Sequence, residues 1–452
     1  MRDGGAPRSV RRGERVTARC IVLVCMTPAP DTSELGELHL PSYGIRRILA
    51  AVVADPALAD SQVALVDIGR PDVDAYVEAV LRFEPDLVGL SIYVWSTPCL
   101  VQVARRIKQR RPQCMVVFGG PSARPAVFDL APYAPASKVL DAVVTTEGEA
   151  VFREIAALTT LDRASLRTVA GLHLPAAGLW LQTGHRPPTD ALDDIASPFQ
   201  LGLMPDDSVA YLETYRGCPL SCRFCEWGAS ETARSCFSTD YIERELVAFG
   251  ELAAPAVFLL DAGLNLNAKA FRNLMDAEAR VGFLKNTTFW AEIYPTLVKD
   301  EHLEFLSRVG TSYLGVGLQS LDPEVLKLHD RPFKQDRFEG ALERLTSVAQ
   351  AELQIIFGLP GDTPAGFRKT LDYARRFGIG VRAYHCLVLP DALLTRGRPG
   401  WDMRFDPVNL AMSSCLGWTA DDIVKTRAML DREVALAGGR AGNYWWSFPH
   451  SR

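Results

Sequence analysis

Short apolar runs alternate with amphipathic stretches along the first third of the chain. The runs have the length and composition of buried strands, and the stretches between them have the periodicity of helices packed on a sheet. This pattern predicts strands at residues 20–26, 62–68, 87–93, 115–118 and 142–145, and helices at residues 43–54, 73–83 and 98–111. Strands and helices that alternate in this way form a parallel, doubly wound sheet. The first part of the chain is therefore predicted to be a Rossmann-like α/β domain.

The same alternation restarts at residue 208 and continues to residue 389. Strands are predicted at residues 208–214, 256–260, 288–293, 313–317, 353–357 and 383–389, and helices at 239–249, 268–281, 299–308, 323–328, 337–349 and 364–377. These six strand–helix units are fewer than a closed (β/α)8 barrel requires. The second part of the chain is therefore predicted to be a partial, TIM-like (β/α)6 barrel.

Turn signals separate the two α/β regions. The segment Pro175-Ala-Ala-Gly178 lies between two apolar stretches and predicts a hairpin over residues 169–182. Beyond residue 393 little regular pattern appears until a helix predicted at residues 420–436. The predicted organisation is a disordered tail (1–17), the Rossmann-like domain (18–165), a linker with the hairpin (166–207), the partial barrel (208–392) and a small C-terminal extension that closes the barrel (393–452).

The composition is that of a soluble globular protein, with 48% hydrophobic and 23% charged residues. The net charge of -5 indicates no basic surface for nucleic acid or an anionic membrane. No apolar run is long enough to span a bilayer. Only three of the ten cysteines lie close together in the sequence, which is typical of a reducing compartment rather than a disulfide framework. We therefore predict a cytoplasmic protein with no nucleic-acid or membrane partner.

Three cysteines follow the first predicted strand of the barrel. Cys218, Cys222 and Cys225 have the spacing C-x3-C-x2-C on one short loop, which suits a shared metal centre better than disulfides between neighbours. A structural zinc needs four ligands, and no second CxxC or CxxH pair follows. A four-iron cluster held by three cysteines leaves one iron open to another ligand. A redox or zinc knuckle is the alternative reading of the same spacing.

The motif C-x3-C-x-aromatic-C after a strand resembles the signature of radical S-adenosylmethionine enzymes. That resemblance implies a [4Fe-4S] cluster on the three cysteines and S-adenosylmethionine at the open iron, where its reductive cleavage releases a 5′-deoxyadenosyl radical. It also implies that Phe224 packs near the adenine. The residues after later strands match the family place by place, so Glu292, Gln319, Ser320 and the backbone around Leu359 are candidates for holding S-adenosylmethionine. Each of these four is otherwise a residue that caps a strand.

Three segments of the first domain are similar to the cobalamin-binding domain that precedes many radical S-adenosylmethionine barrels. They are residues 88–96, 117–121 and 146–149, and their candidate cobalamin contacts are Ser91, Gly119, Gly120, Pro121, Glu147 and Gly148. Glycine allows a close backbone approach to a bulky cofactor. The Asp-x-His-x-x-Gly motif that gives cobalt a histidine is absent, because Asp67-Ile-Gly69 lacks it. We therefore expect base-off cobalamin with no histidine ligand; the alternative is a Rossmann-like domain that has lost its ligand.

The resemblance implies a cobalamin-dependent methyltransferase. It would transfer a methyl group from methylcobalamin to an unactivated carbon, or phosphorus, of a small molecule or peptide, in secondary-metabolite biosynthesis. An external electron donor of the flavodoxin or ferredoxin type is implied as a partner. Asp391, beyond the last barrel strand, is a candidate substrate contact. The alternatives are radical rearrangement or cyclisation without methyl transfer, a non-radical cobalamin-dependent methyltransferase, and a non-enzymatic corrinoid or iron–sulfur carrier. The sequence leaves substrate identity and oligomeric state open.

Overall fold

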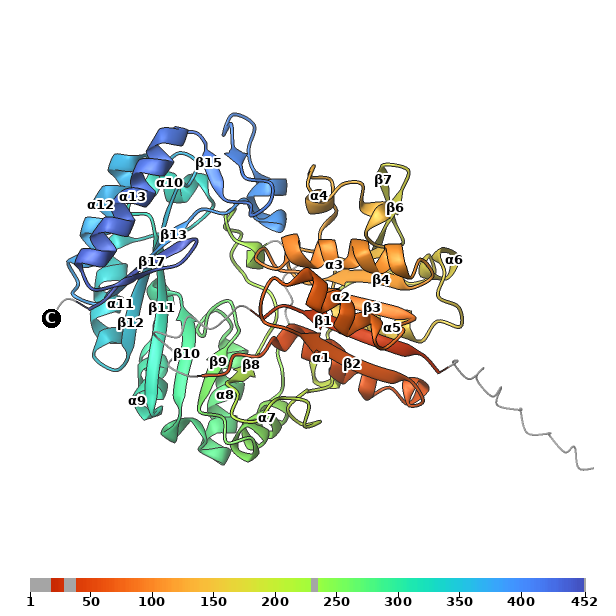
Figure 1. Ribbon diagram of the computed structural model, residues 1–452. Helices are drawn as coiled ribbons and strands as arrows, with labels where there is room; N and C mark the ends of the chain where they lie inside the picture. The colour runs from red at the N-terminus through yellow and green to blue at the C-terminus, as the bar shows by residue number, and fades with distance from the viewer. Residues whose placement is uncertain (1–17, 28–37, 229–234, 451–452) are drawn as a thin grey trace, which may run out of the picture.

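The computed structural model describes residues 18–27, 38–228 and 235–450. Two α/β units lie side by side, the first coloured red to yellow and the second green to blue (Figure 1). The predicted disordered tail, residues 1–17, lies outside the described residues. Of the helices in the described part of the chain, none combines the length and the apolar character that crossing a bilayer requires.

The first unit is built on a sheet with the strand order β2-β1-β3-β4-β5-β6-β7. Its strands are β1 (Cys20–Cys25), β2 (Gln62–Asp67), β3 (Leu87–Ser91), β4 (Met115–Gly119), β5 (Ala142–Val144), β6 (Leu172–Ala176) and β7 (Leu179–Gln182). The first five are parallel, as the alternating pattern predicted. The order 2-1-3-4-5 is that of flavodoxin-like sheets, whose ligands bind at the C-terminal ends of the strands near the switch between β1 and β3.

Helices cover both faces of this sheet and bury two apolar cores. Helices α2 (Val73–Leu81) and α3 (Thr97–Arg110) pack in one core, and α1 (Tyr43–Val53) and α5 (Gly148–Ala156) pack in the other. The sequence pattern predicted three of these helices and missed α5. Glu147 is the N-cap of α5, so the segment that we expected only to end a strand also begins a helix.

The predicted hairpin is present, and it extends the first sheet. Strand β6 pairs antiparallel with β5, and β7 pairs antiparallel with β6. Its two turn residues, Ala177 and Gly178, have φ values of 47° and 83°. Positive φ at both central residues is the signature of a type I′ turn, whose twist matches that of the flanking strands.

The second sheet contains the six predicted parallel strands in sequence order. They are β8 (Ala210–Leu212), β9 (Ala256–Leu259), β10 (Thr288–Ile293), β11 (Thr311–Gln319), β12 (Gln350–Phe357) and β13 (Gly380–His385). Their helices lie on the outer, convex side of the curved sheet (Figure 1). These helices are α7 (Thr239–Glu251), α8 (Ala268–Val281), α9 (Asp300–Arg308), α10 (Pro323–Leu328), α11 (Gln335–Thr346) and α12 (Pro364–Arg375). The prediction of a partial barrel is confirmed.

The C-terminal extension lengthens this sheet. Strand β17 (Trp445–Phe448) pairs antiparallel with β13, and β16 (Arg440–Ala441) pairs with β17. In the described part of the chain the outermost strands of the sheet, β8 and β16, do not pair with each other, so the sheet stays open. The rest of the extension forms β14 (Arg404–Phe405), β15 (Met412–Ser414) and the long helix α13 (Ala420–Leu436).

The inner, concave face of the second sheet is accessible. Along β11 the residues Leu314, Val316 and Leu318 are buried beneath the helices, whereas the alternate residues are partly exposed. Tyr313 is 37% exposed on this inner side. In a closed barrel the corresponding positions are filled by layers of packed side chains. The inner face therefore offers room for ligands beside the strand ends.

Candidate functional site

The cysteine loop is attached to the end of strand β9 through Asp261. Its carboxylate accepts hydrogen bonds from the backbone nitrogens of Thr214, at 2.8 Å, and Tyr215, at 3.4 Å, and from the Thr214 hydroxyl. Burial raises the pKa of Asp261 to about 7, although these hydrogen bonds oppose that effect. The Tyr215 hydroxyl donates to the Gly263 carbonyl at 2.9 Å. The loop therefore starts from a fixed position.

The thiols of the three cysteines of this loop point away from solvent to different degrees. Cys218 and Cys222 are buried and Cys225 is partly buried. Burial raises the pKa of Cys218, and the charge of Cys222 raises it further. The guanidinium of Arg331 lies 3.9 Å from the Cys222 sulfur and offsets part of that shift. The thiols are therefore close enough to influence one another, in positive surroundings suited to an anionic centre.

Arg396 holds the backbone of the same loop. It lies just after the short helical segment η7 (Pro390–Leu394) that follows β13. Its guanidinium donates to the carbonyls of Cys222, at 3.0 Å, Ser221, at 3.4 Å, and Cys225, while its Nε donates to the Asp391 carbonyl at 2.8 Å. One side chain thus joins the cysteine loop to the C-terminal end of the last parallel strand.

These residues fit an iron–sulfur cluster better than a single metal ion. Among the described residues no three His, Cys, Asp or Glu side chains come close enough together to bind one ion. A tetrahedral zinc site needs four ligands, whereas the cysteine loop supplies three. Three cysteine sulfurs suit a cubane, because each of them binds a different iron.

A cavity of about 740 Å³ lies between the two units. It is lined by all six predicted cobalamin contacts, Ser91, Gly119, Gly120, Pro121, Glu147 and Gly148, at the C-terminal ends of β3, β4 and β5. Gly217 and Glu226, which flank the cysteines on either side, line it as well. One cavity therefore adjoins both predicted cofactor sites.

The backbone of the cavity wall suits a bulky, close-fitting ligand. A Cβ atom added at Gly119 would meet nothing nearer than Val144, at 3.9 Å, so the bare backbone faces open space there. Gly120 has a φ of 98°, and a Cβ atom there would lie 2.8 Å from the Ile92 carbonyl oxygen. Ile45 and Phe152 add an apolar surface. A volume of this size is typical of cofactor sites, so the residues fit cobalamin.

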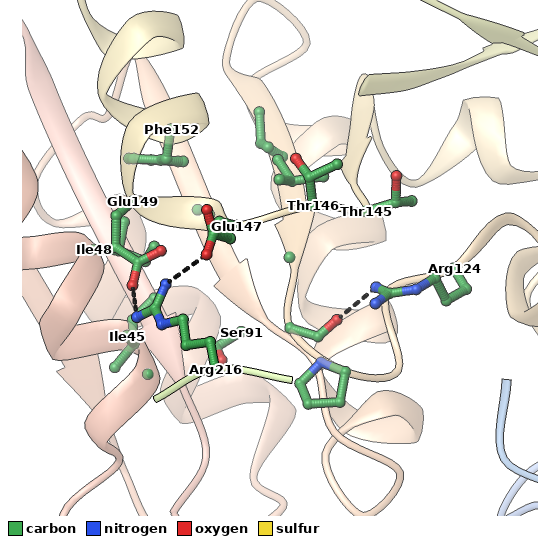
Figure 2. A pocket seen from close by; sticks show the side chains of 18 of the residues that line it. Ile45, Ile48, Ser91, Arg124, Thr145, Thr146, Glu147, Glu149, Phe152 and Arg216 are labelled. Carbon is green, nitrogen blue, oxygen red and sulfur yellow. Dashed lines mark hydrogen bonds and ion pairs between the residues drawn. The ribbon is translucent and has the colours of Figure 1, made fainter. Parts of the chain in front are cut away.

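A buried ion network joins the two units along the cavity wall. Arg216 lies 2.6 Å from Glu149, 3.0 Å from Glu213 and 3.3 Å from Glu147, and it lies between Glu147 and Glu149 in Figure 2. Arg47, on α1, lies 3.7 Å from Glu149 and 3.5 Å from Glu213. Burial disfavours the charged form of Glu149, but the two arginines outweigh it and lower its pKa to about 2. Because Arg216 lies two residues before Cys218, the network ties the cobalamin domain to the cysteine loop.

A second contact between the units involves Asp391, the residue predicted to meet substrate. Its carboxylate lies 2.5 Å from Arg124, which follows the Gly-Gly-Pro segment, and both residues line the cavity. The Asp391 backbone nitrogen donates to Glu226 at 3.3 Å. Burial raises the pKa of Glu226 to about 7, and the Asp391 charge contributes to the shift. Trp227 is 48% exposed and also lines this wall.

Two of the candidate S-adenosylmethionine residues lie on the concave face of the barrel. Glu292 accepts a hydrogen bond from Gln354 at 2.8 Å, and burial raises the pKa of its carboxyl. Gln319 sits at a β-bulge with a φ of 67°, where the register between β11 and β12 shifts. The bulge turns its amide toward Gly317, where a Cβ atom would come within 2.5 Å of the amide nitrogen. Both side chains therefore belong to strands whose inner face is accessible.

The other candidates are packed into the protein. Ser320 is fully buried, its hydroxyl donates to Asp362 at 3.4 Å, and it accepts from the Asp322 nitrogen at 3.2 Å. Leu359 is also fully buried. The side chains of these two residues are therefore packed in the protein interior. Phe224 is partly buried, with its ring 5.7 Å from His329, and packs at the edge of the barrel core.

Comparison with known proteins agrees with this division into two units. Residues 38–156 match the family model described as "B12 binding domain", and residues 212–374 match the model described as "Radical SAM superfamily".

Among curated proteins, the chain is similar to 2-(S-pantetheinyl)-carbapenam-3-carboxylate methyltransferase of Streptantibioticus cattleyicolor. The two are 30% identical over 390 residues, and the match covers 78% of this chain and 54% of that protein. It is 28% identical over 342 residues to the cobalamin-dependent radical SAM methyltransferase TokK of Streptomyces tokunonensis, covering 69% of this chain and 48% of that protein. The chain thus spans about half the length of these curated relatives.

Solved structures show the same fold at low sequence identity. The methyltransferase TsrM of Kitasatospora setae, with cobalamin and a [4Fe-4S] cluster bound, has a TM-score of 0.64 at 15% identity, covering 87% of this chain and 84% of that one. The cobalamin-dependent S-adenosylmethionine radical enzyme OxsB, with aqua-cobalamin and S-adenosylmethionine bound, has a TM-score of 0.69 at 12% identity, covering 93% and 67%.

Proposed function

Because the chain belongs to the radical S-adenosylmethionine enzymes that carry a B12-binding domain, we propose that it is a cobalamin-dependent methyltransferase. It transfers a methyl group to an unactivated carbon of a small molecule or peptide. The observation that carries this proposal is the single cavity that adjoins both the six candidate cobalamin residues and the two ends of the cysteine loop. A methyl donor and a radical generator must both reach the same substrate atom, and this cavity lies where both can.

The proposed cofactor contacts follow from the placement of the residues. Cys218, Cys222 and Cys225 hold the cluster, and the six cavity residues around β3, β4 and β5 hold cobalamin. Phe224, Glu292, Gln319 and the backbone at Ser320 and Leu359 hold S-adenosylmethionine. When bound, these groups supply a methyl donor and a radical that abstracts a hydrogen atom.

The protein's own side chains orient and isolate these groups. Arg396 fixes three carbonyls of the cysteine loop, and Arg216 fixes that loop to the cobalamin domain. Arg331 stands 3.9 Å from the Cys222 sulfur, where its positive charge stabilises an anionic centre. Asp391 and Glu226 place two carboxyls in the cavity wall, available to hydrogen-bond a substrate.

We propose that cobalt carries no histidine ligand. His185, in the segment between the units, lines the cavity and is the natural competitor for that role. The absence of the Asp-x-His-x-x-Gly motif supports base-off cobalamin. The electron paramagnetic resonance spectrum of the Co(II) form tests this. We expect no nitrogen splitting from the protein, and a spectrum that is the same in a His185→Ala variant.

The remaining proposals concern the localisation, the pathway, the partners and the domain limits of the protein. The protein acts in the cytoplasm in the biosynthesis of a secondary metabolite, takes electrons from an external carrier and binds no nucleic acid. The proposed limits are residues 18–165, 166–207, 208–392 and 393–452, and the hairpin of the second segment extends the sheet of the first. Both family matches fall within the first and third of these, which supports the division.

Anaerobic reconstitution with iron, sulfide and hydroxocobalamin tests the function. With dithionite and S-adenosylmethionine, we expect slow formation of 5′-deoxyadenosine even without substrate. We expect this to be lost in Cys222→Ala and retained in Cys20→Ala, a cysteine of the first domain. Methylated product together with 5′-deoxyadenosine establishes radical methylation. A product without the methyl group indicates rearrangement or cyclisation, and turnover without 5′-deoxyadenosine indicates a polar methyltransferase. Cleavage that persists in Cys222→Ala would refute the mechanism.

A further inference from the structure

The cysteine loop reaches the molecular surface on the side away from its sulfurs. Pro219 and Ser221 are exposed, whereas Cys218 and Cys222, beside them in the chain, are buried. Each of the two exposed residues is adjacent in the chain to one of these buried cysteines, so the loop brings the backbone beside its thiols to the surface here. If the cysteines hold the cluster, as proposed above, this surface lies beside it.

Three arginines and one aspartate surround this surface, and we call Arg223, Arg396, Arg398 and Asp330 the basic rim. Arg223 lies 2.7 Å from Asp330 and donates to the Arg396 carbonyl at 3.1 Å. Arg398 is 41% exposed and lies 3.7 Å from Asp330, which is 36% exposed. The rim therefore combines residues of the cysteine loop, the end of α10 and the segment after η7.

The basic rim carries a net positive charge on an acidic protein. Two of the three guanidinium groups share one carboxylate, because Asp330 is the partner of both Arg223 and Arg398. Arg396 donates to carbonyls, and none of the carboxylates in the described ranges lies within ion-pair distance of it. The chain as a whole has a net charge of -5. A local positive patch against that background attracts an acidic partner.

We infer that the basic rim is the docking surface for an acidic protein that delivers single electrons to the cluster. This inference rests on the proposed function and names the place where the electron enters. One electron leaves the reduced flavin or iron–sulfur centre of the carrier and is taken up by the cluster. The carrier is thereby oxidised by one electron, and no bond forms or breaks. The rim meets the two requirements of such a partner, because it is charge-complementary and contacts the backbone of the cysteine loop.

The substrate does not compete for this surface. The cavity between the units is lined by Glu226 and Trp227, beyond the last cysteine, whereas none of the four rim residues lines it. Carrier and substrate can therefore be bound at the same time. The electron enters from the solvent side of the loop, and the chemistry takes place on the cavity side.

Charge reversal at the exposed edge of the rim tests the inference. Arg398→Glu is the variant, and Arg308→Glu is its matched control, because Arg308 is an exposed arginine paired with a glutamate at the opposite end of the barrel. Photoreduced bacterial flavodoxin is mixed anaerobically with the reconstituted full chain, and bleaching of the cluster absorbance is followed by stopped flow. Dithionite is the small-molecule control reductant.

We expect Arg398→Glu to slow reduction by flavodoxin about tenfold at low ionic strength, with less than a twofold effect in about 0.5 M salt. Arg308→Glu should change it less than about twofold. Asp330→Asn, which raises the positive charge of the rim, should accelerate it. Dithionite should reduce all four proteins at similar rates, which also shows that the cluster is intact.

The inference is wrong if flavodoxin reduces wild type, Arg398→Glu and Asp330→Asn equally fast, or if Arg308→Glu is slowed as much as Arg398→Glu. It is also wrong if flavodoxin fails to reduce the wild-type protein that dithionite reduces. Failure of the proposed function looks different, because then no dithionite-driven 5′-deoxyadenosine forms in any of the proteins.

Discussion

Replacement of Arg216 by methionine should separate the contribution of the interdomain ion network from that of ordinary packing. Arg216 contacts Glu147, Glu149 and Glu213. Its removal leaves Glu213 and Glu149 with Arg47, at 3.5 Å and 3.7 Å. Removing one partner of a buried ion pair costs about 3–5 kcal/mol, since the remaining charge stays buried.

The pKa of Glu149 gives an independent magnitude. Its fall from 4.5 to about 2 corresponds to about 3 kcal/mol of stabilisation of the folded state, in the same range. Since the folded-state pKa lies below the unfolded value, this contribution is fully present above about pH 5 and is lost as the pH falls from 4.5 toward 2. Arg216→Met should therefore be less stable at pH 7 and should lose less further stability on acidification.

Thermal unfolding at several pH values measures both effects. We expect the Tm of Arg216→Met to fall by about 10 °C at pH 7, using about 2–4 °C per kcal/mol for a domain of this size. Lys108→Met is the control. It breaks an ion pair of 2.9 Å with Asp141 that is also partly buried but lies within the first unit, and it should cost about 1 kcal/mol. A Tm for Arg216→Met within about 2 °C of wild type, or equal losses in the two variants, would refute the reasoning.

Three other predictions concern the cofactor sites. Gly119→Val should weaken cobalamin binding at least about tenfold without unfolding the protein, because a side chain there enters the cavity. Gly340→Val, at an open position on α11, is the control, and titration followed by absorbance measures cobalamin binding to both variants. Arg396→Met should lower the iron bound per chain after reconstitution by about half or more, because it removes the hydrogen bonds to the carbonyls of the cysteine loop. Arg404→Met, at an exposed arginine, is the control and should not lower it. Equal iron contents would show that the loop does not need the hydrogen bonds of Arg396. Glu292→Gln should weaken S-adenosylmethionine binding about tenfold in calorimetry and leave cobalamin binding unchanged, and unaltered binding would remove Glu292 from the site.

The hydrophobic pattern predicted the parallel strands of both sheets because each of them has a strong local signal, whereas it missed β16 and β17 in the C-terminal extension. The six candidate cobalamin residues line one cavity for a topological reason, because parallel strands bring their C-terminal ends to one edge of a sheet. The prediction of the metal centre depended on the spacing of the three cysteines, which is visible in the sequence alone.

Three arginines that hold the site together, at positions 47, 124 and 396, were not predicted from the sequence. Arg396 lies in a segment without periodicity, and nothing local distinguishes it from a solvated arginine. Arg47 lies on an amphipathic helix, and its burial follows only from the approach of the second unit. Arg124 follows the Gly-Gly-Pro segment, and this position was the one available signal for it. Ser320 was predicted from its place after a strand, but the bulge at Gln319 precedes it and its hydroxyl is turned into the protein core.

The open concave face of the second sheet affects the stability of the protein before its cofactors bind. A barrel whose inner face stays open lacks packing contacts that a filled barrel has. The form without ligands is therefore the least stable one. Whatever binds there stabilises the native state by mass action. Loading with the cofactors is thus a late stage of folding. A shortage of iron or cobalamin should make the protein more susceptible to proteolysis as well as abolish its activity.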